Sequence, residues 1–176
     1  QLLPLISEQS MLQETAQRVT GQRVSGTGSK FSDPIIISND THRFIIAAQM
    51  EEMGITSDVH ILEPFGRGTA PAAIVAAIHI AFSDLAGLML LLSADHHIPE
   101  LAKFHDAIDI ASKAAAEGYL TTFGIEPTGP ETGFGYIKSG NETKVGGAFS
   151  VERFVEKPDK ANAEKMIAAG RHYWNG

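Results

Sequence analysis

Acidic side chains follow two apolar runs of the chain, at points where they could bind a metal ion and phosphates. Asp95 comes after residues 88–92, and Glu63 comes after residues 60–62. Because ligands of open α/β sheets bind outside the carboxyl ends of the strands, we expect both carboxylates to lie in a binding crevice. A hard carboxylate near phosphates suits Mg²⁺. Asp95 is therefore a candidate magnesium ligand; the alternative is that it only caps the helix that follows.

Basic side chains and glycines near these positions could contact phosphate. Arg67 opens a predicted helix, where a guanidinium can form a fork with phosphate or carboxylate oxygens; the alternative is a solvated surface charge. Lys157 follows Glu156, and the two could equally form a surface ion pair. A loop glycine such as Gly135 lets the backbone approach a ligand and donate its N–H, although a plain turn also explains such glycines.

Three weaker patterns carry less information. Residues 26–30 (GTGSK) faintly resemble a phosphate loop, but a helix precedes them and no Lys stands before the Ser or Thr. His96 and His97 point to opposite faces of an extended segment, so we do not expect them to share a metal ion. The other histidines are scattered, and no Gly-x-Ser-x-Gly motif is present, so we expect neither a histidine metal centre nor a serine nucleophile.

The elements that must position these residues alternate between strand and helix after a first helix that begins at a capping box, Ser10 to Gln13. Strands are predicted at 34–39, 60–62, 88–92 and 119–125, and helices at 41–53, 72–82 and 99–117. This alternation predicts a parallel sheet with helices on both faces. We expect residues 88–92 to form a strand buried on both faces, and residues 72–82 to pack on several sides.

The pattern changes after residue 125. A turn-rich loop is followed by short strands at 136–137 and 151–155, which could pair antiparallel. Asp159 can cap a last helix, which Gly170 ends. Because no repeat or linker interrupts the sequence, we expect residues 1–176 to form one compact domain.

Composition excludes several classes of function. The chain has 176 residues, of which 43% are hydrophobic and 20% charged, as in an ordinary globular protein. Its net charge of -7 argues against binding a nucleic-acid polymer. It has no cysteine, so it has neither disulfides nor thiolate chemistry. No signal peptide or long apolar run is present, so we expect a cytoplasmic protein that does not bind a membrane.

Eight runs, in order along the chain, resemble the sugar-nucleotide pyrophosphorylases, and among them the mannose-1-phosphate guanylyltransferases of the long bacterial type often fused to a phosphomannose isomerase domain. They are residues 10–15 (SMLQET), 42–44 (HRF), 62–72 (LEPFGRGTAPA), 94–96 (ADH), 122–125 (TFGI), 130–137 (PETGFGYI), 154–158 (FVEKP) and 173–175 (YWN). The resemblance implies a Rossmann-like, mostly parallel α/β fold, with residues 1–176 as a single nucleotidyltransferase domain.

The resemblance also implies a reaction, in which a guanylyl group passes from GTP to mannose 1-phosphate to give GDP-mannose and pyrophosphate. The residues implied for nucleotide binding are Glu63, Arg67, Thr69 and Ala70. Those implied for the sugar phosphate are Gly135, Tyr136, Glu156, Lys157 and Asn175. Asp95 would bind Mg²⁺, and Asp95 and Lys157 would be catalytic. This agrees with the chemistry, because in-line attack between phosphates needs charge neutralisation and alignment, not a covalent nucleophile.

The sequence departs from the family pattern at three places. The glycine-rich signature loop that grips the triphosphate is expected before Gln1, and a second metal carboxylate is expected beyond Gly176. We therefore expect the chain to be incomplete at both ends and, taken alone, feeble or inactive. Gly68 also stands where the closest relatives usually have Asn, which is expected to alter that loop or its contacts with the base.

Two other functions stay open. One is a glucose-1-phosphate thymidylyl- or uridylyltransferase, which would share the fold and differ in substrates. The other is a noncatalytic regulatory subunit that senses sugar nucleotides. The oligomeric state is also open, including a homo-oligomer.

Overall fold

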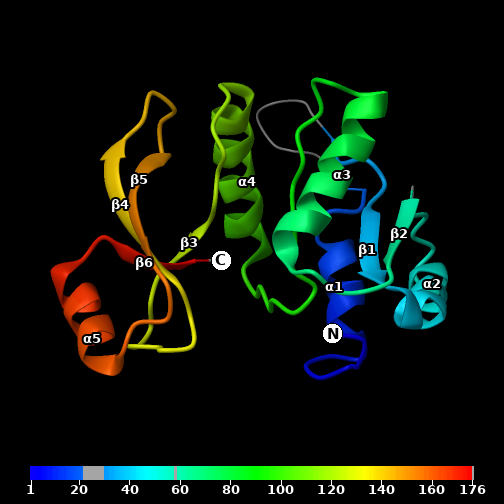
Figure 1. The fold of residues 1–176 in the computed structure, drawn as a ribbon, viewed down its shortest axis with the longest axis horizontal. Helices are drawn as coiled ribbons and strands as arrows, with labels where there is room; N and C mark the ends of the chain where they lie inside the picture. The colour runs from blue at the N-terminus through cyan, green and yellow to red at the C-terminus, as the bar shows by residue number, and fades with distance from the viewer. Residues whose placement is uncertain (22–29, 58, 176) are drawn as a thin grey trace. The chain divides into compact units, whose positions relative to one another are not determined.

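The chain divides into two compact units, unit 1 (Gln1–His105) and unit 2 (Asp106–Gly176), and each is described by itself. The computed structural model describes residues 1–21, 30–57 and 59–175 (Figure 1). The elements are α1 (Met11–Gln17), β1 (Ile35–Asn39), the 3-10 helix η1 (Asp40–His42), α2 (Arg43–Glu52), β2 (Val59–Glu63), α3 (Thr69–Ser83), α4 (Leu101–Ala116), β3 (Gly124–Ile125), β4 (Tyr136–Glu142), β5 (Phe149–Val155), α5 (Lys160–Ala169) and β6 (His172–Asn175). Residues 26–29 of the weak phosphate-loop motif lie outside the described residues.

Unit 1 contains a parallel pair of strands, β1 and β2, in register from Ile35 opposite Val59 to Asn39 opposite Glu63. The helix between them, α2, turns its buried side chains Ile46 and Met50 into a core shared with β1 and α1. Parallel strands need such a crossover connection. The predicted parallel pairing of these two strands is confirmed, and Glu63 ends β2 at the carboxyl edge of the pair.

The predicted capping box at the start of α1 is also confirmed. The Ser10 hydroxyl accepts a hydrogen bond from Gln13 N, and the Gln13 side chain accepts one from Ser10 N. Ser10 is buried, and its hydroxyl donates to Gln49 Oε1 of α2 at 2.8 Å. The cap therefore satisfies free N–H groups of α1 and at the same time ties α1 to α2.

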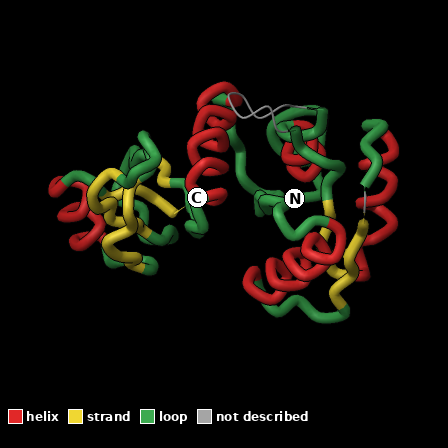
Figure 2. The backbone as a smooth tube through the Cα atoms, turned by 90° about the horizontal axis from the view of Figure 1, so that it is seen from above, coloured by secondary structure: helices red, strands yellow, loops and turns green. Residues whose placement is uncertain are grey.

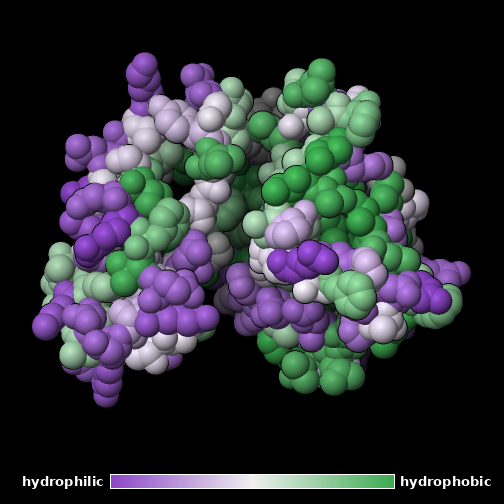
Figure 3. Space-filling view, viewed as in Figure 1, coloured by the Kyte–Doolittle hydropathy of each residue, from purple (hydrophilic) through white to green (hydrophobic). Residues whose placement is uncertain are grey.

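Two predictions for unit 1 are wrong. Residues 88–92 belong to no strand, and Leu88 and Leu91 are about half exposed instead of buried on both faces. Helix α3 does not pack on several sides, since Ile74 and Phe82 are 59% and 88% exposed. Figure 3 shows apolar surface gathered over α3. An apolar run shows how much surface needs covering, but a strand also needs a neighbour for its backbone hydrogen bonds.

Unit 2 contains a four-stranded antiparallel sheet in the order β3-β6-β4-β5. The predicted antiparallel pairing of β4 with β5 is confirmed, but of the predicted strand at 119–125 only β3 forms. Helix α5 lies beside β6 (Figure 2). It is capped as predicted, with the Asp159 side chain accepting from Asn162 N and Gly170 at its end. The side chains of Tyr136 and Ala163 are completely buried in this unit.

The predicted α/β fold with a parallel sheet and helices is confirmed, although the larger of the two sheets is antiparallel. The expectation that residues 1–176 act as one domain stays a prediction. Among the helices of the described residues, none is long and apolar enough to span a bilayer.

Candidate active site

The connection from β2 to α3 carries the four residues predicted to bind a nucleotide. Glu63 is the last residue of β2 and is partly buried, while Thr69 and Ala70 are the first two residues of α3. The first N–H groups of a helix have no partner inside the helix, so they can bind an anion. The N-cap residue Gly68 has φ 85° and ψ -179°, a conformation that almost only glycine adopts. Glycine at this position therefore fits the backbone of the loop.

Arg67 lies one residue before that N-cap, and its side chain is exposed. The contacts of the described residues include no ion pair between Arg67 and a carboxylate. Its guanidinium is thus available to a phosphate that approaches the start of α3.

Asp95 lies in an exposed turn, where one carboxylate oxygen accepts a hydrogen bond from Gln1 Nε2 at 3.1 Å. Because residues 88–92 form no strand, the prediction that Asp95 stands at the carboxyl end of a sheet strand is wrong. No hydrogen bond or ion pair of the described residues joins Asp95 to Glu63 or Arg67.

The turn that carries Asp95 is held by Arg18, a residue that the sequence did not single out. The Arg18 side chain is only 5% exposed, and its guanidinium donates a hydrogen bond to the carbonyl of His96 at 2.5 Å. The Arg18 carbonyl in turn lies 2.8 Å from His105 Nε2. Burial lowers the pKa of Arg18, and the charge of Glu14 opposes that shift. A buried arginine that binds a backbone carbonyl has no signature in a single sequence.

Asp95, the residue predicted to bind Mg²⁺, is an exposed carboxylate. The described residues contain no group of three or more His, Cys, Asp or Glu side chains that could hold a metal ion. Mg²⁺, however, keeps several waters and is usually bound by one or two carboxylates and by substrate phosphates. A single exposed carboxylate fits that kind of site.

Three of the residues predicted to bind the sugar lie together in unit 2. A Cβ added to Gly135 would stand 3.1 Å from Glu156 Oε2 and 3.6 Å from Asn175 Cβ. Asn175 N donates to the Gly135 carbonyl at 2.9 Å, which continues the pairing of β4 with β6. The absence of a side chain at Gly135 therefore lets the Glu156 carboxylate and the Asn175 side chain come close to its backbone; we name these three residues (Gly135, Glu156 and Asn175) the Gly135 cradle.

Lys157 lies beside this cradle in a strained backbone conformation. Its Nζ is 3.3 Å from Glu156 Oε1, so the surface ion pair weighed as an alternative is present. Its φ is 39°, in the region that residues other than glycine seldom adopt. Such strain often persists at binding sites, because the surrounding structure imposes it.

Tyr136, predicted to bind the sugar phosphate, is a buried residue of β4. Its ring is completely buried, and its hydroxyl donates to the Glu131 carbonyl at 2.9 Å. Trp174 of β6, which lies opposite Tyr136 in the sheet, packs edge-on against Phe134 with ring centroids 5.1 Å apart. The Tyr136 side chain thus anchors the loop before β4 and is not exposed to a ligand.

Thr122 is a second residue that sequence reasoning missed. Its hydroxyl donates to Asn175 Oδ1 at 3.0 Å. Residues 122–125 match the family as a run, but the contact depends on the pairing of β3 with β6, which brings Thr122 to within reach of Asn175. Only that register, and no residue type, could have indicated it.

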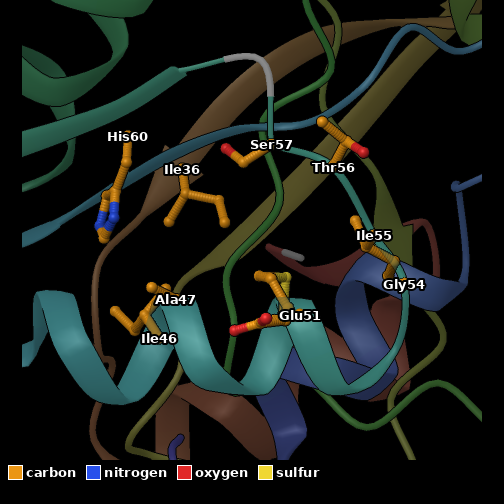
Figure 4. A pocket seen from close by; sticks show the side chains of 10 residues that line it. Ile36, Ile46, Ala47, Glu51, Gly54, Ile55, Thr56, Ser57 and His60 are labelled. Atoms are coloured by element: carbon orange, nitrogen blue, oxygen red, sulfur yellow. The ribbon is translucent and has the colours of Figure 1, made fainter.

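Unit 1 contains a pocket of about 410 Å³ (Figure 4). It is lined by Ile36, Ile46, Ala47, Met50, Glu51, Gly54, Ile55, Thr56, Ser57 and His60. It is lined by core residues of α2 and β1, and one of its polar groups is already bonded, since His60 Nε2 lies 2.8 Å from Ser38 Oγ. Burial lowers the pKa of His60. The pocket contains none of the predicted site residues.

Comparisons with known proteins agree with the resemblance. A family model described as nucleotidyl transferase matches residues 1–176. The chain is 46% identical over 175 residues to the xanthan biosynthesis protein XanB of Xanthomonas campestris pv. campestris (strain B100), covering 99% of this chain and 35% of that protein. It is 44% identical over 177 residues to the mannose-1-phosphate guanylyltransferase of Klebsiella pneumoniae, covering 99% of this chain and 36% of that protein.

A solved structure shares the fold. The crystal structure of a protein described as mannose-6-phosphate isomerase from Helicobacter pylori superposes with a TM-score of 0.80 at 29% identity, covering 99% of this chain and 63% of that one. The chain spans little more than a third of the length of the Xanthomonas and Klebsiella relatives.

Proposed function

Because the chain belongs to the nucleotidyl transferase family, we propose that it is part of a mannose-1-phosphate guanylyltransferase, which forms GDP-mannose and pyrophosphate from GTP and mannose 1-phosphate. The observation that carries this proposal is the 44% identity, over nearly the whole chain, to a relative of that name. The site geometry is compatible with it. The start of α3 offers N–H groups to phosphate, and Glu156 and Asn175 offer hydrogen-bonding groups to a sugar.

In the proposed reaction, a phosphate oxygen of mannose 1-phosphate attacks the α-phosphorus of GTP. The bond from that phosphorus to the oxygen bridging to the β-phosphate breaks, and pyrophosphate leaves with the electron pair. Both reactants carry negative charge, so the protein must reduce their repulsion and hold them in line. No covalent intermediate is needed.

Unit 1 supplies the nucleotide groups of the proposal. The N–H groups at the start of α3, at Thr69 and Ala70, and the exposed Arg67 guanidinium bind phosphate oxygens. Glu63 accepts hydrogen bonds from the nucleotide. Asp95 binds Mg²⁺, which when bound offsets the charge of the phosphates and orients them.

Unit 2 supplies the sugar phosphate groups. Glu156 and Asn175 bind hydroxyls of the hexose, and the backbone of Gly135 lies close to both side chains because it carries no Cβ. Lys157 binds the phosphate, for which it has to leave its ion pair with Glu156. Tyr136 holds the strand beneath them. Since GTP and sugar phosphates are made and used in the cytoplasm, we place the protein there, with no nucleic-acid or membrane partner.

The test is a substrate matrix with the full-length protein. Pyrophosphate release is measured for GTP, UTP and dTTP, each with mannose 1-phosphate and glucose 1-phosphate, in the presence of Mg²⁺. We expect GTP with mannose 1-phosphate to give the largest kcat/KM. A preference for dTTP or UTP would favour the thymidylyl- or uridylyltransferase instead. Binding of GDP-mannose without pyrophosphate release from any pair would favour the regulatory subunit.

A further inference from the structure

We infer that Thr122 is a positioning residue, which orients the side-chain amide of Asn175 so that its NH₂ group donates to a hexose hydroxyl. This inference rests on the proposed function of the Gly135 cradle. It starts from one contact, the hydrogen bond from Thr122 Oγ1 to Asn175 Oδ1 at 3.0 Å between side chains that are both exposed.

The backbone of Asn175 is held by strand pairing, and Thr122 lies close to one of the paired strands. Asn175 lies opposite Gly124 in the pairing of β6 with β3, and its N–H donates to the Gly135 carbonyl. Thr122 stands two residues before Gly124. The torsions of the Asn175 side chain are therefore the freedom that remains, and the Thr122 hydroxyl restricts them.

The chemistry of the cradle determines which end of the amide faces the sugar. An asparagine side chain has one acceptor oxygen and one NH₂ donor group, and the Thr122 hydroxyl donates to the oxygen and so turns that end of the amide toward Thr122. The Glu156 carboxylate, an acceptor, lies 3.1 Å from the position of a Cβ on Gly135, beside which Asn175 also lies. An amide oxygen turned toward that carboxylate would be repelled by it, whereas the NH₂ group is attracted.

The result is a donor and an acceptor that both lie beside Gly135. Asn175 donates and Glu156 accepts, so together they match two neighbouring hydroxyls of a hexose, because each hydroxyl can both donate and accept. Thr122 acts on the sugar only through Asn175. It should therefore affect binding of the sugar phosphate and leave binding of the nucleotide unchanged.

The experiment compares two substitutions in the full-length protein. Thr122→Val has nearly the same shape and removes the hydroxyl, whereas Thr122→Ser keeps it. We expect Thr122→Val to raise the KM for mannose 1-phosphate about tenfold, the size of one lost hydrogen bond, with the KM for GTP unchanged. Thr122→Ser should stay within about twofold of the wild type. Thr121→Val, next along the chain and also exposed, is the matched control and should change neither KM.

A double substitution tests whether Thr122 acts through Asn175. In an Asn175→Ala background, Thr122→Val should have no further effect on binding of mannose 1-phosphate, measured by calorimetry. Additive effects, equal effects of Val and Ser, or a matching rise in the KM for GTP would overturn the inference. These results leave the proposed function intact if the wild type makes GDP-mannose. A wild type that neither turns over nor binds mannose 1-phosphate would overturn both.

Discussion

At the scale of single residues, the absence of a side chain at Gly135 is the most direct feature to test. In Gly135→Ala the new methyl would stand 3.1 Å from Glu156 Oε2, a contact tighter than ordinary van der Waals distance. Because the φ of Gly135 is not positive, the backbone itself accepts alanine. We expect the KM for mannose 1-phosphate to rise at least about tenfold, since the methyl takes up space for the sugar. Steady-state kinetics of GDP-mannose formation measure this change.

The matched control is Gly133→Ala in the same loop. A Cβ at Gly133 would meet nothing within 4 Å, and its φ is also not positive. This variant should therefore keep both KM values near those of the wild type. If the two alanine variants behaved alike, Gly135 would have no special place in sugar binding.

Asp95 is the residue on which the metal part of the proposal depends. Asp95→Asn keeps the shape and the acceptor for Gln1 Nε2, but removes the negative charge. We expect Mg²⁺-dependent kcat/KM to fall by roughly 100-fold or more, because the metal loses its protein ligand. Calorimetry in the presence of GTP should show that Mg²⁺ also binds more weakly to Asp95→Asn than to the wild type. The thermal unfolding midpoint should stay unchanged.

Asp106→Asn serves as the control for this change, since Asp106 is an exposed carboxylate on α4. It should leave both the rate and Mg²⁺ binding as they are. An Asp95→Asn protein with wild-type activity would remove Asp95 from the mechanism.

At the scale of elements, His60 of β2, which contacts Ser38 of β1, predicts that the stability of the protein depends on pH. Burial lowers the pKa of His60 in the folded protein, whereas the unfolded chain keeps a value of about 6.5. As the pH falls through about 6.5, the unfolded state takes up a proton that the folded state does not, so the free energy of unfolding decreases. The decrease ends below the lowered folded pKa. Stability is therefore highest above this window.

Urea unfolding between pH 7.5 and pH 5 can test this dependence. His60→Gln removes the titrating group but can still bond to Ser38, so its unfolding free energy should decline less than that of the wild type over this range. His42→Gln replaces an exposed histidine on η1 and should decline as the wild type does. Parallel curves for His60→Gln and the wild type would contradict the assignment to His60.

The same scale shows what the sequence could and could not predict. The caps at Ser10 and Asp159 and the strands β1 and β2 were predicted because their signals are local. Residues 88–92 were predicted wrongly, because five apolar residues in a row indicate burial but not a hydrogen-bonding neighbour. The contacts of Arg18 and Thr122 were also missed, since each joins segments more than 50 residues apart. Residue type alone does not record such pairings.

At the scale of the whole molecule, the two compact units divide the proposed chemistry between them. The residues proposed for the nucleotide and for Mg²⁺ all belong to unit 1, and those proposed for the sugar phosphate all belong to unit 2. Each group is held by its own unit: the start of α3 and the Arg18 contact in the first, and the β6 pairing in the second. The two substrates should therefore order different parts of the chain.

Hydrogen exchange of the full-length protein can separate these effects, because amides that a ligand orders exchange more slowly. GTP with Mg²⁺ should protect residues 63–70 and 94–97, and mannose 1-phosphate should protect residues 122–137 and 154–175. GDP-mannose should protect both sets, since it contains both halves. Removing Mg²⁺ with a chelator should abolish the protection of residues 94–97 by GTP. The protection of residues 154–175 by mannose 1-phosphate should remain. Protection of unit 2 by GTP alone would show that the nucleotide and sugar residues have been assigned to the wrong units, whatever the activity of the protein.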